Sequence, residues 1–273
     1  MNTYEKFINF LSTEMPRQQA PYMPFHIIML VLVFATTIFL CVKFKNCSDR
    51  TFRKIIFIIW VILFVFEIYK QMVAPFSVVD GKAVWYYNYN DIPYQFCSTI
   101  HYVLLPIAFM KDGKLRNGLM MFVMTYIFVA GFGATVYADQ LKSDMAIGIC
   151  VQTMVHHGLQ VVAGAFIAVR MRDKLCLKDF LYGMAVFAFF LVIAIILDVV
   201  LKPGVVNNGA INFFYISPYH KCPLPILTDL KELMPWSVFV LGYFVFFTLG
   251  GLIVYLIGVG IKKAYRKKKL KNS

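Results

Sequence analysis

Long apolar segments alternate with short polar segments along nearly the whole chain. Seven apolar segments stand out, over residues 24–42, 55–73, 94–110, 118–137, 146–169, 180–201 and 236–261. Each approaches the length of about 20 residues that an α-helix needs to cross about 30 Å of hydrocarbon. Backbone groups in hydrocarbon must be hydrogen-bonded within their own segment, so the pattern indicates helices. The sequence therefore predicts an all-α membrane protein, a bundle of seven transmembrane helices.

The composition agrees with this prediction. The 273 residues are 60% hydrophobic and 15% charged, whereas a soluble domain has about 45–50% apolar and about 25% charged residues. We expect an extracytoplasmic N-terminal segment over residues 1–22, a membrane domain over 23–261 and a basic cytoplasmic tail over 262–273. No room remains for a separate soluble domain.

The net charge of +13 is distributed unevenly. The segments 43–54, 111–116, 170–179 and 262–271 hold 19 of the 27 basic residues but only four of the 14 acidic residues. Lys and Arg are retained on the cytoplasmic side of membrane proteins, so we predict an N-terminus outside and a C-terminus in the cytoplasm. The basic tail follows a membrane span directly, so we expect no nucleic-acid partner. The sequence indicates no soluble partner and leaves the oligomeric state open.

Ionisable side chains inside hydrocarbon cost a few kcal/mol each, which makes them candidates for function. Those in the predicted spans are Glu67, Lys70, Cys97, His101, His156, His157 and Asp198. Gln152, His156 and Gln160 recur every four residues and form one polar stripe on a helix. All of these residues fall in the outer half of the membrane, and no polar cluster faces inward. The pattern favours a cavity that opens to the outer leaflet.

Cys97 has the most suggestive surroundings. Asn90-Asp91-Ile92-Pro93 is a helix-start signal, which places Cys97 about one turn into a helix, where backbone N–H groups stabilise a thiolate. His101 follows four residues later on the same helix face, within reach of the thiol. Cys97 could instead be an inert small apolar residue or form a disulfide with Cys222. No cysteine pair has the spacing of a zinc site, and we expect neither a metal nor a cofactor.

The other polar residues also have structural interpretations. His156 and His157 point about 100° apart on a helix, so only one of them needs to line a cavity, and either could simply join helices. A Glu67–Lys70 ion pair is favoured over a proton relay, and Asp198 could pair near the membrane surface. The aromatic outer segments 77–93 and 202–235 are expected to lie along the outer interface.

Two motifs resemble the YwaF-like bacterial integral membrane proteins. The first is the run 92–100, Ile-Pro-Tyr-Gln-Phe-Cys-Ser-Thr-Ile, followed by Leu105-Pro106. The second is Ile211-Asn-Phe-Phe-Tyr215 with Pro218 and a Met-Pro-Trp sequence that ends at residue 236. The family is related to the eukaryotic transmembrane protein 164, an acyltransferase that uses a cysteine to move fatty acyl chains between phospholipids.

The resemblance implies a role for several residues. Cys97 would be the acyl-accepting nucleophile, His156 or His157 the general base, and Asn212 a residue that orients the site or stabilises an oxyanion. Gln95 stands where several relatives have His, Phe213 stands where they have Tyr, and His101 has no counterpart. The location that the resemblance implies is the plasma membrane of a bacterium.

Two main functions remain open. The first is a cysteine-dependent phospholipid acyltransferase or lipid-remodelling enzyme that acts from the outer leaflet, with membrane phospholipids as its partners; a cytoplasmic donor fits poorly because no polar cluster faces inward. The alternative is a small-solute transporter or membrane binding component that uses Glu67, His156 and Asp198 in the same cavity. A third interpretation gives the polar groups the structural role of holding helices together. Cys97→Ala would abolish the activity of the enzyme, whereas a transporter or binding component would keep its function.

Overall fold

The computed structural model describes residues 1–14, 22–137, 146–205 and 211–271, with the backbone alone over residues 264–271. Residues 15–21 of the predicted N-terminal segment and residues 272–273 of the predicted tail lie outside the described residues. The described chain is mostly helical, as the apolar pattern predicts.

Five helical segments in the described part of the chain are long and apolar enough to cross a membrane. They are α2 (Pro24–Lys43), the continuous segment Lys114–Tyr137, α7 (Ile147–Met171), α8 (Leu177–Val200) and the apolar part of α10 (Trp236–Lys271). The continuous segment consists of α5 (Lys114–Phe122), a π-helical turn (Val123–Ile127) and α6 (Phe128–Tyr137). A multi-pass helical membrane protein is therefore confirmed.

The other two predicted spans differ from these five. The second coincides with α3 (Asp49–Val73), a helix of 25 residues. The third contains the helical segment Phe96–Phe109, in which a 3-10 turn leads into α4 (Ile100–Phe109), a helix of 10 residues. At about 1.5–2 Å per residue this segment rises roughly 23 Å, less than the hydrocarbon layer of about 30 Å. The chain enters this segment through extended backbone and a 3-10 turn, which apolar composition alone does not distinguish from an α-helix. The count of seven spans stays a prediction.

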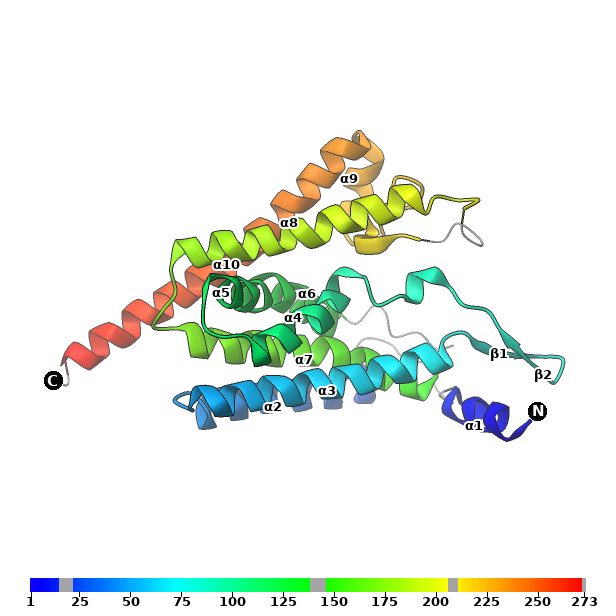
Figure 1. Ribbon diagram of the computed structural model, residues 1–273, viewed down its shortest axis with the longest axis horizontal. Helices are drawn as coiled ribbons and strands as arrows, with labels where there is room; N and C mark the ends of the chain where they lie inside the picture. Colours follow the sequence, from blue (N-terminus) through cyan, green and yellow to red (C-terminus); the bar gives the residue numbers. More distant parts are fainter. Residues whose placement is uncertain (15–21, 138–145, 206–210, 272–273) are drawn as a thin grey trace.

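The helices lie in layers (Figure 1). α2 and α3 cover one side, α8 and α10 cover the other, and α4, α5 and α6 lie between them. α7 contacts α2, α3 and α6, and α5 packs against α8. α7 is thus the central helix of one half of the bundle, which places its polar stripe in the interior.

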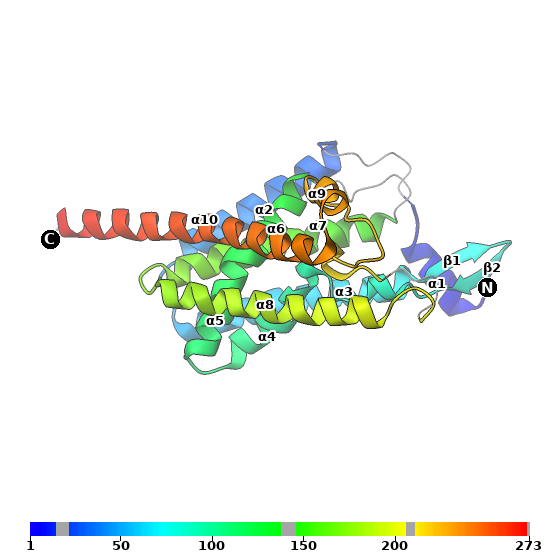
Figure 2. The same cartoon turned by 90° about the horizontal axis from the view of Figure 1, so that it is seen from above.

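Two small elements cap one end of the bundle (Figures 1 and 2). They are α1 (Thr3–Leu11) and the antiparallel hairpin of β1 (Phe76–Val79) and β2 (Lys82–Trp85). Tyr4 stacks on Trp85, with ring centroids 6.1 Å apart, and the Tyr69 hydroxyl donates to the Leu11 carbonyl at 2.8 Å. The C-terminal part of α10 extends from the opposite end.

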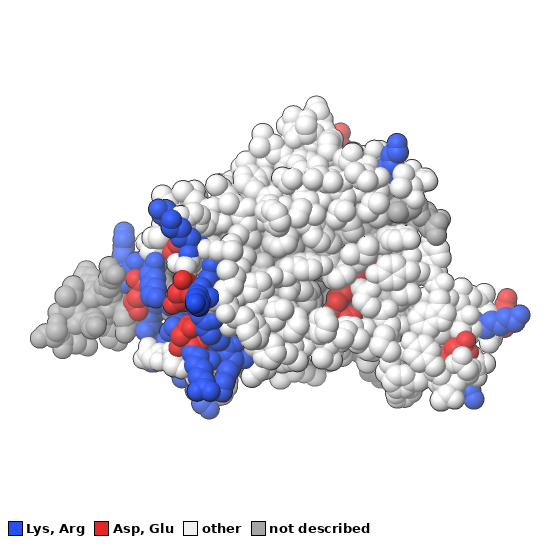
Figure 3. All heavy atoms as spheres, viewed as in Figure 1, with Lys and Arg blue, Asp and Glu red and all other residues white. Residues whose placement is uncertain are grey.

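Lys and Arg side chains gather at that opposite end, which we call the basic end (Figure 3). The ion pairs of Asp49 with Arg116 and Arg170 bring three predicted inner connections together, and Lys262 of α10 donates to the Leu175 carbonyl at 2.9 Å. These connections also form a polar cluster that the sequence pattern did not predict, in which the Arg116 side chain is only 2% exposed. The buried charge of Arg116 is compensated by the carboxylates of Asp49 and Asp112. Asp49 lies far from Arg116 in the sequence, so sequence patterns do not reveal this pair.

The loop before α9 (Leu227–Leu233) is buried. Residues 211–217, which we call the buried loop, include Ile211, Phe213, Phe214, Ile216 and Ser217, each at most 1% exposed. The expectation that the segment 202–235 lies along the outer interface is therefore wrong for this part of it. Side chains from the bundle satisfy the polar backbone of the loop, which makes its burial possible.

Candidate functional site

Cys97 lies at the start of a short helical segment. It is the second residue of the 3-10 helix η2 (Phe96–Thr99), which leads directly into α4. The helix start expected at residues 90–93 is wrong: residues 89–91 form a separate 3-10 turn, and the chain is extended again at Gln95. Cys97 is half-buried and free, as is the buried Cys222, so the structure contains no disulfide between them.

The backbone of Cys97 contacts the polar stripe of α7. The Gln160 amide donates to the Cys97 carbonyl at 3.1 Å, and the His156 ring lies near the Cys97 backbone. Gln152, His156 and Gln160 are all buried, so the stripe faces the interior as the spacing predicts. Through Gln160, the stripe joins α7 to the 3-10 turn that carries the Cys97 thiol.

His101 lies with His156 rather than with the thiol. The two rings stack with centroids 5.3 Å apart and an interplanar angle of 30°. The His101 Nε2 atom is 3.9 Å from Glu67 Oε2, and no hydrogen bond to Cys97 is seen among the described residues. The helix turns the His101 ring toward α7 and α3, and its reach to the thiol stays a prediction.

The two adjacent histidines have different surroundings. His157 Nδ1 lies 3.0 Å from the Thr153 carbonyl of its own helix, whereas His156 stacks on His101. The rings of His156 and His157 meet edge-on at 5.2 Å. Of the two, His156 is the one that stacks on His101 and lies near the Cys97 backbone.

Glu67 connects this group to α3. Its carboxylate pairs with Lys70 at 2.9 Å, as the spacing predicts, and accepts a hydrogen bond from Gln71 at 2.7 Å. The Gln71 amide also donates to the Asp91 carbonyl, and the Tyr87 hydroxyl donates to Gln71 at 2.7 Å. The outer segment 77–93 is thereby tied to the buried acid.

Several polar atoms of this group lack a hydrogen-bond partner among the described residues. They are Glu67 Oε2, both ring nitrogens of His101, His156 Nδ1 and Gln160 Oε1. We call Glu67, His101, His156, His157 and Gln160 the histidine cluster. Buried polar atoms without partners are costly, so their concentration in one place is typical of a functional site.

Two tyrosines lie on another side of Cys97. Cys97 and Cys222 are both within electrostatic range of Tyr215 and Tyr243. Burial raises the pKa of Tyr215 to about 12, and the nearby cysteines add to this effect. The Tyr215 hydroxyl is therefore protonated at neutral pH and can donate a hydrogen bond. The sequence predicted neither tyrosine as a site residue: Tyr215 ends the second motif, 211–215, whereas no pattern in the sequence singles out Tyr243.

Gln95 and Asp198 hold the buried loop against this site. The Gln95 amide donates to the Asn212 carbonyl at 3.0 Å and accepts from the Phe214 N–H at 2.9 Å. Asp198 accepts from the Phe213 N–H at 2.8 Å. Phe214 and Tyr215 both have left-handed backbone, with φ of 53° and 59°. Such strain persists only where surrounding contacts over-determine the conformation.

Asn212 is engaged within the loop region. Its side chain donates to the Lys221 carbonyl at 3.0 Å and accepts from the Ser217 N–H at 3.1 Å. Its backbone N–H donates to the Asn90 side chain at 2.7 Å. The contacts show Asn212 shaping the loop that carries Tyr215, and its role toward an oxyanion stays a prediction.

An apolar groove of about 210 Å³ lies between α9 and α10. Tyr243 is part of its lining, together with Leu230, Phe239, Gly242 and Phe246. Because Tyr243 is also within electrostatic range of Cys97, one buried side chain lies between the groove and the neighbourhood of the thiol.

Fold and site together define a multi-pass helical membrane protein with a polar cluster and a cysteine in its interior. The chain belongs to the TMEM164 family, whose sequence profile matches residues 21–257. No matching curated protein or solved structure was found.

Proposed function

We propose that the protein transfers an acyl chain from a membrane phospholipid through a thioester at Cys97. The observation that carries the proposal is the position of Cys97: its carbonyl accepts from Gln160 of the histidine cluster, and the groove-lining Tyr243 lies near it. Membership of the TMEM164 family supports a membrane-embedded function.

The first step is attack by sulfur on the ester carbonyl carbon. The thiol proton passes to His156, a C–S bond forms, and the carbonyl oxygen becomes an oxyanion that the Tyr215 hydroxyl stabilises. Collapse of this intermediate breaks the ester C–O bond. The lysophospholipid oxygen leaves with the proton from His156, and the acyl chain remains on Cys97.

The second step reverses these roles. The hydroxyl of a lysophospholipid, or water, loses its proton to His156 and attacks the thioester carbon. The C–S bond breaks, and the sulfur takes back the proton. Stacking on His101, which lies 3.9 Å from Glu67, orients the His156 ring during both steps.

A turnover assay tests the proposal. The purified protein in lipid nanodiscs is given a fluorescent phospholipid, and release of lysophospholipid is measured for wild type, Cys97→Ser and Cys222→Ser. Loss of a catalytic nucleophile costs at least about 10³-fold in rate, so Cys97→Ser should be inactive. Cys222 lies near the same two tyrosines, and Cys222→Ser is the matched control. Equal activity of the Cys97 and Cys222 variants would contradict the proposal.

The groove between α9 and α10 is our proposed site for the acyl chain. A side chain at Gly242 would meet no atom within 4 Å, so Gly242→Phe should fill the groove without straining the helix. Turnover of long-chain phospholipids should fall by at least tenfold, as estimated from several lost methylene contacts of about 0.8 kcal/mol each, while short-chain substrates retain their rate. Gly260 of the same helix is equally open, so Gly260→Phe is the control. A Gly242→Phe enzyme with unchanged chain-length preference would exclude this groove.

A second candidate function is binding or transport of a small polar solute. The observation that favours it is the set of unpartnered atoms in the histidine cluster. In that case solute uptake into proteoliposomes should survive Cys97→Ala and be lost in His156→Ala. An acyltransferase shows the opposite dependence on Cys97.

A further inference from the structure

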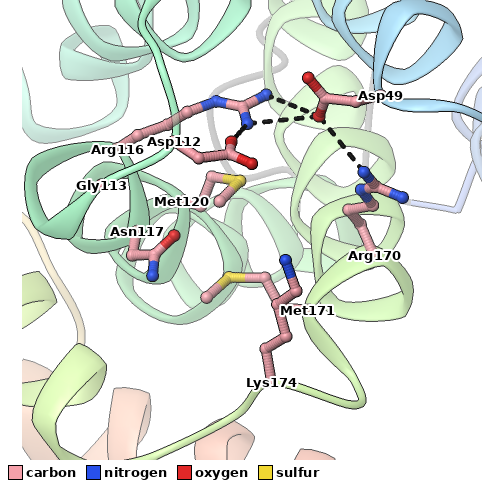
Figure 4. A pocket seen from close by; sticks show the side chains of 9 residues that line it. All are labelled: Asp49, Asp112, Gly113, Arg116, Asn117, Met120, Arg170, Met171 and Lys174. Atoms are coloured by element: carbon pink, nitrogen blue, oxygen red, sulfur yellow. Dashed lines mark hydrogen bonds and ion pairs between the residues drawn. The ribbon is translucent and has the colours of Figure 1, made fainter.

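A pocket of about 100 Å³ opens at the basic end (Figure 4). It lies where the start of α3, the α4–α5 connection and the end of α7 meet. The polar side chains that line it are Asp49, Asp112, Arg116, Asn117, Arg170 and Lys174.

The ion pairs around the pocket leave positive charge uncompensated. One oxygen of Asp49 accepts from Arg116 and Arg170, at 3.3 and 3.2 Å, and the other accepts from Arg53. Asp112 pairs with Arg116. The two carboxylates of Asp49 and Asp112 thus pair with three guanidinium groups, which leaves one positive charge in excess. Lys174, which also lines the pocket, adds a second.

Two donors of the pocket have no partner among the described residues. They are the Lys174 ammonium and the Asn117 amide, which come from the α7–α8 connection and from α5. In Figure 4 the Lys174 side chain extends toward the ion pairs of Asp49, and Asn117 lies on the neighbouring helix. Asn117 lies beside Arg116 on α5, and Lys174 approaches from below in the view of Figure 4.

The backbone adds donors to the same space. Gly113, a lining residue, precedes the first turn of α5, and no side chain caps that turn. The N–H groups of a helix start are anion donors. Guanidinium, ammonium, amide and backbone donors then surround one small volume.

We propose that this pocket binds the phosphate group of an anionic phospholipid at the basic end. The donor set fits a phosphate because its several oxygens can accept from the Arg116 and Arg170 guanidiniums and from Lys174 together. The lipid source follows from position: the pocket lies at the end of the bundle where Lys and Arg side chains cluster (Figure 3), and such clusters attract anionic lipid surfaces. Basic pockets between membrane helices bind anionic headgroups in this way. The inference does not depend on acyl transfer.

Lipid retention and thermal stability test the site with one pair of variants. Lys174→Ala removes a pocket donor, while Lys178→Ala removes the same charge from an exposed position nearby that does not line the pocket. Native mass spectrometry measures retention of phosphatidylglycerol against phosphatidylcholine, and thermal unfolding is followed with inorganic phosphate or chloride at equal ionic strength.

We expect phosphatidylglycerol to bind about tenfold more weakly to Lys174→Ala than to wild type, as loss of one charge-assisted hydrogen bond predicts. Lys178→Ala should bind like wild type. Stabilisation by inorganic phosphate that Lys174→Ala loses, without selective lipid retention, would assign the same pocket to a soluble phosphate and overturn the lipid source. Equal behaviour of the two variants in both measurements would overturn the site itself.

Discussion

Gln95 is a single residue on which the shape of the candidate site depends. The nitrogen of its side-chain amide donates to the Asn212 carbonyl of the buried loop, and the oxygen accepts from the Phe214 N–H. Gln95→Ala leaves a buried donor and a buried acceptor unpaired, each costing about 1–3 kcal/mol. We expect a markedly lower thermal unfolding midpoint and faster proteolysis of the loop.

Asp198 provides a graded test of the same loop. Asp198→Asn keeps an oxygen that can accept from the Phe213 N–H, whereas Asp198→Ala does not. The alanine variant should therefore lose about 1–3 kcal/mol of unfolding free energy, and the asparagine variant clearly less. Equal losses in chemical unfolding would show that this hydrogen bond does not hold the loop.

Asp91 gives a pH-dependent prediction outside the membrane spans. Burial raises the pKa of its carboxyl above the ordinary value of 3.8, opposed by Lys70 and assisted by Glu67. Ionisation of Asp91 therefore opposes folding above the raised pKa, and the cost disappears as the pH falls through it toward 3.8. Asp91→Asn should unfold at a higher temperature than wild type at neutral pH, and the difference should shrink on acidification. A constant difference across this range would contradict the assignment.

At the residue scale the sequence identified the polar stripe of α7 and the Glu67–Lys70 pair, because both follow from helical spacing. It did not identify Tyr215 beside Cys97, since residues 118 positions apart meet only after the loop is buried. The stacking of His101 on His156 likewise depends on how two helices pack.

At the scale of elements, the packing of α6 against α7 holds Gln160 in the position from which it bonds Cys97. A Cβ atom at Gly131 would lie 2.5 Å from Gln160 Cβ and 2.9 Å from Gln160 Oε1. Gly131→Ala should therefore cost about 1–3 kcal/mol and displace the amide that bonds Cys97. At Gly133 of the same helix the space is open, so Gly133→Ala should be neutral or stabilising by up to about 1 kcal/mol. Equal unfolding midpoints for the two variants would contradict this packing.

The apolar pattern located the long helices well, because length and composition alone determine whether a helix can span hydrocarbon. It failed where an apolar segment is not one helix. Residues 94–110 contain an extended entry and a 3-10 turn before α4. The buried loop has left-handed backbone at Phe214 and Tyr215. Neither residue is a glycine, so the sequence does not indicate this conformation.

For the whole molecule, the clustered charge predicts the orientation in the membrane. Cys176 is exposed at the basic end, at the start of α8, and Lys82 is exposed on the hairpin at the other end. In variants with one accessible cysteine, an impermeant maleimide should label Lys82→Cys on intact cells and label Cys176 only after permeabilisation. The reverse pattern would invert the orientation and place the phosphate pocket outside.

The charge distribution along the sequence was sufficient to foresee that the basic connections share one end, since alternating loops of a bundle must do so. The pocket among them was not foreseeable, because Asp49, Arg116 and Arg170 come from three separate connections. Their pairing requires the packed bundle.

The central claim is that Cys97 carries the acyl chain, and intact mass measures this most directly. Wild type, Cys97→Ser and Cys222→Ser are incubated with phospholipid and weighed before and after hydroxylamine. We predict an acyl-sized adduct on wild type and Cys222→Ser that hydroxylamine removes, and none on Cys97→Ser. An adduct that persists on Cys97→Ser, or no adduct on wild type while it turns over phospholipid, would contradict the account.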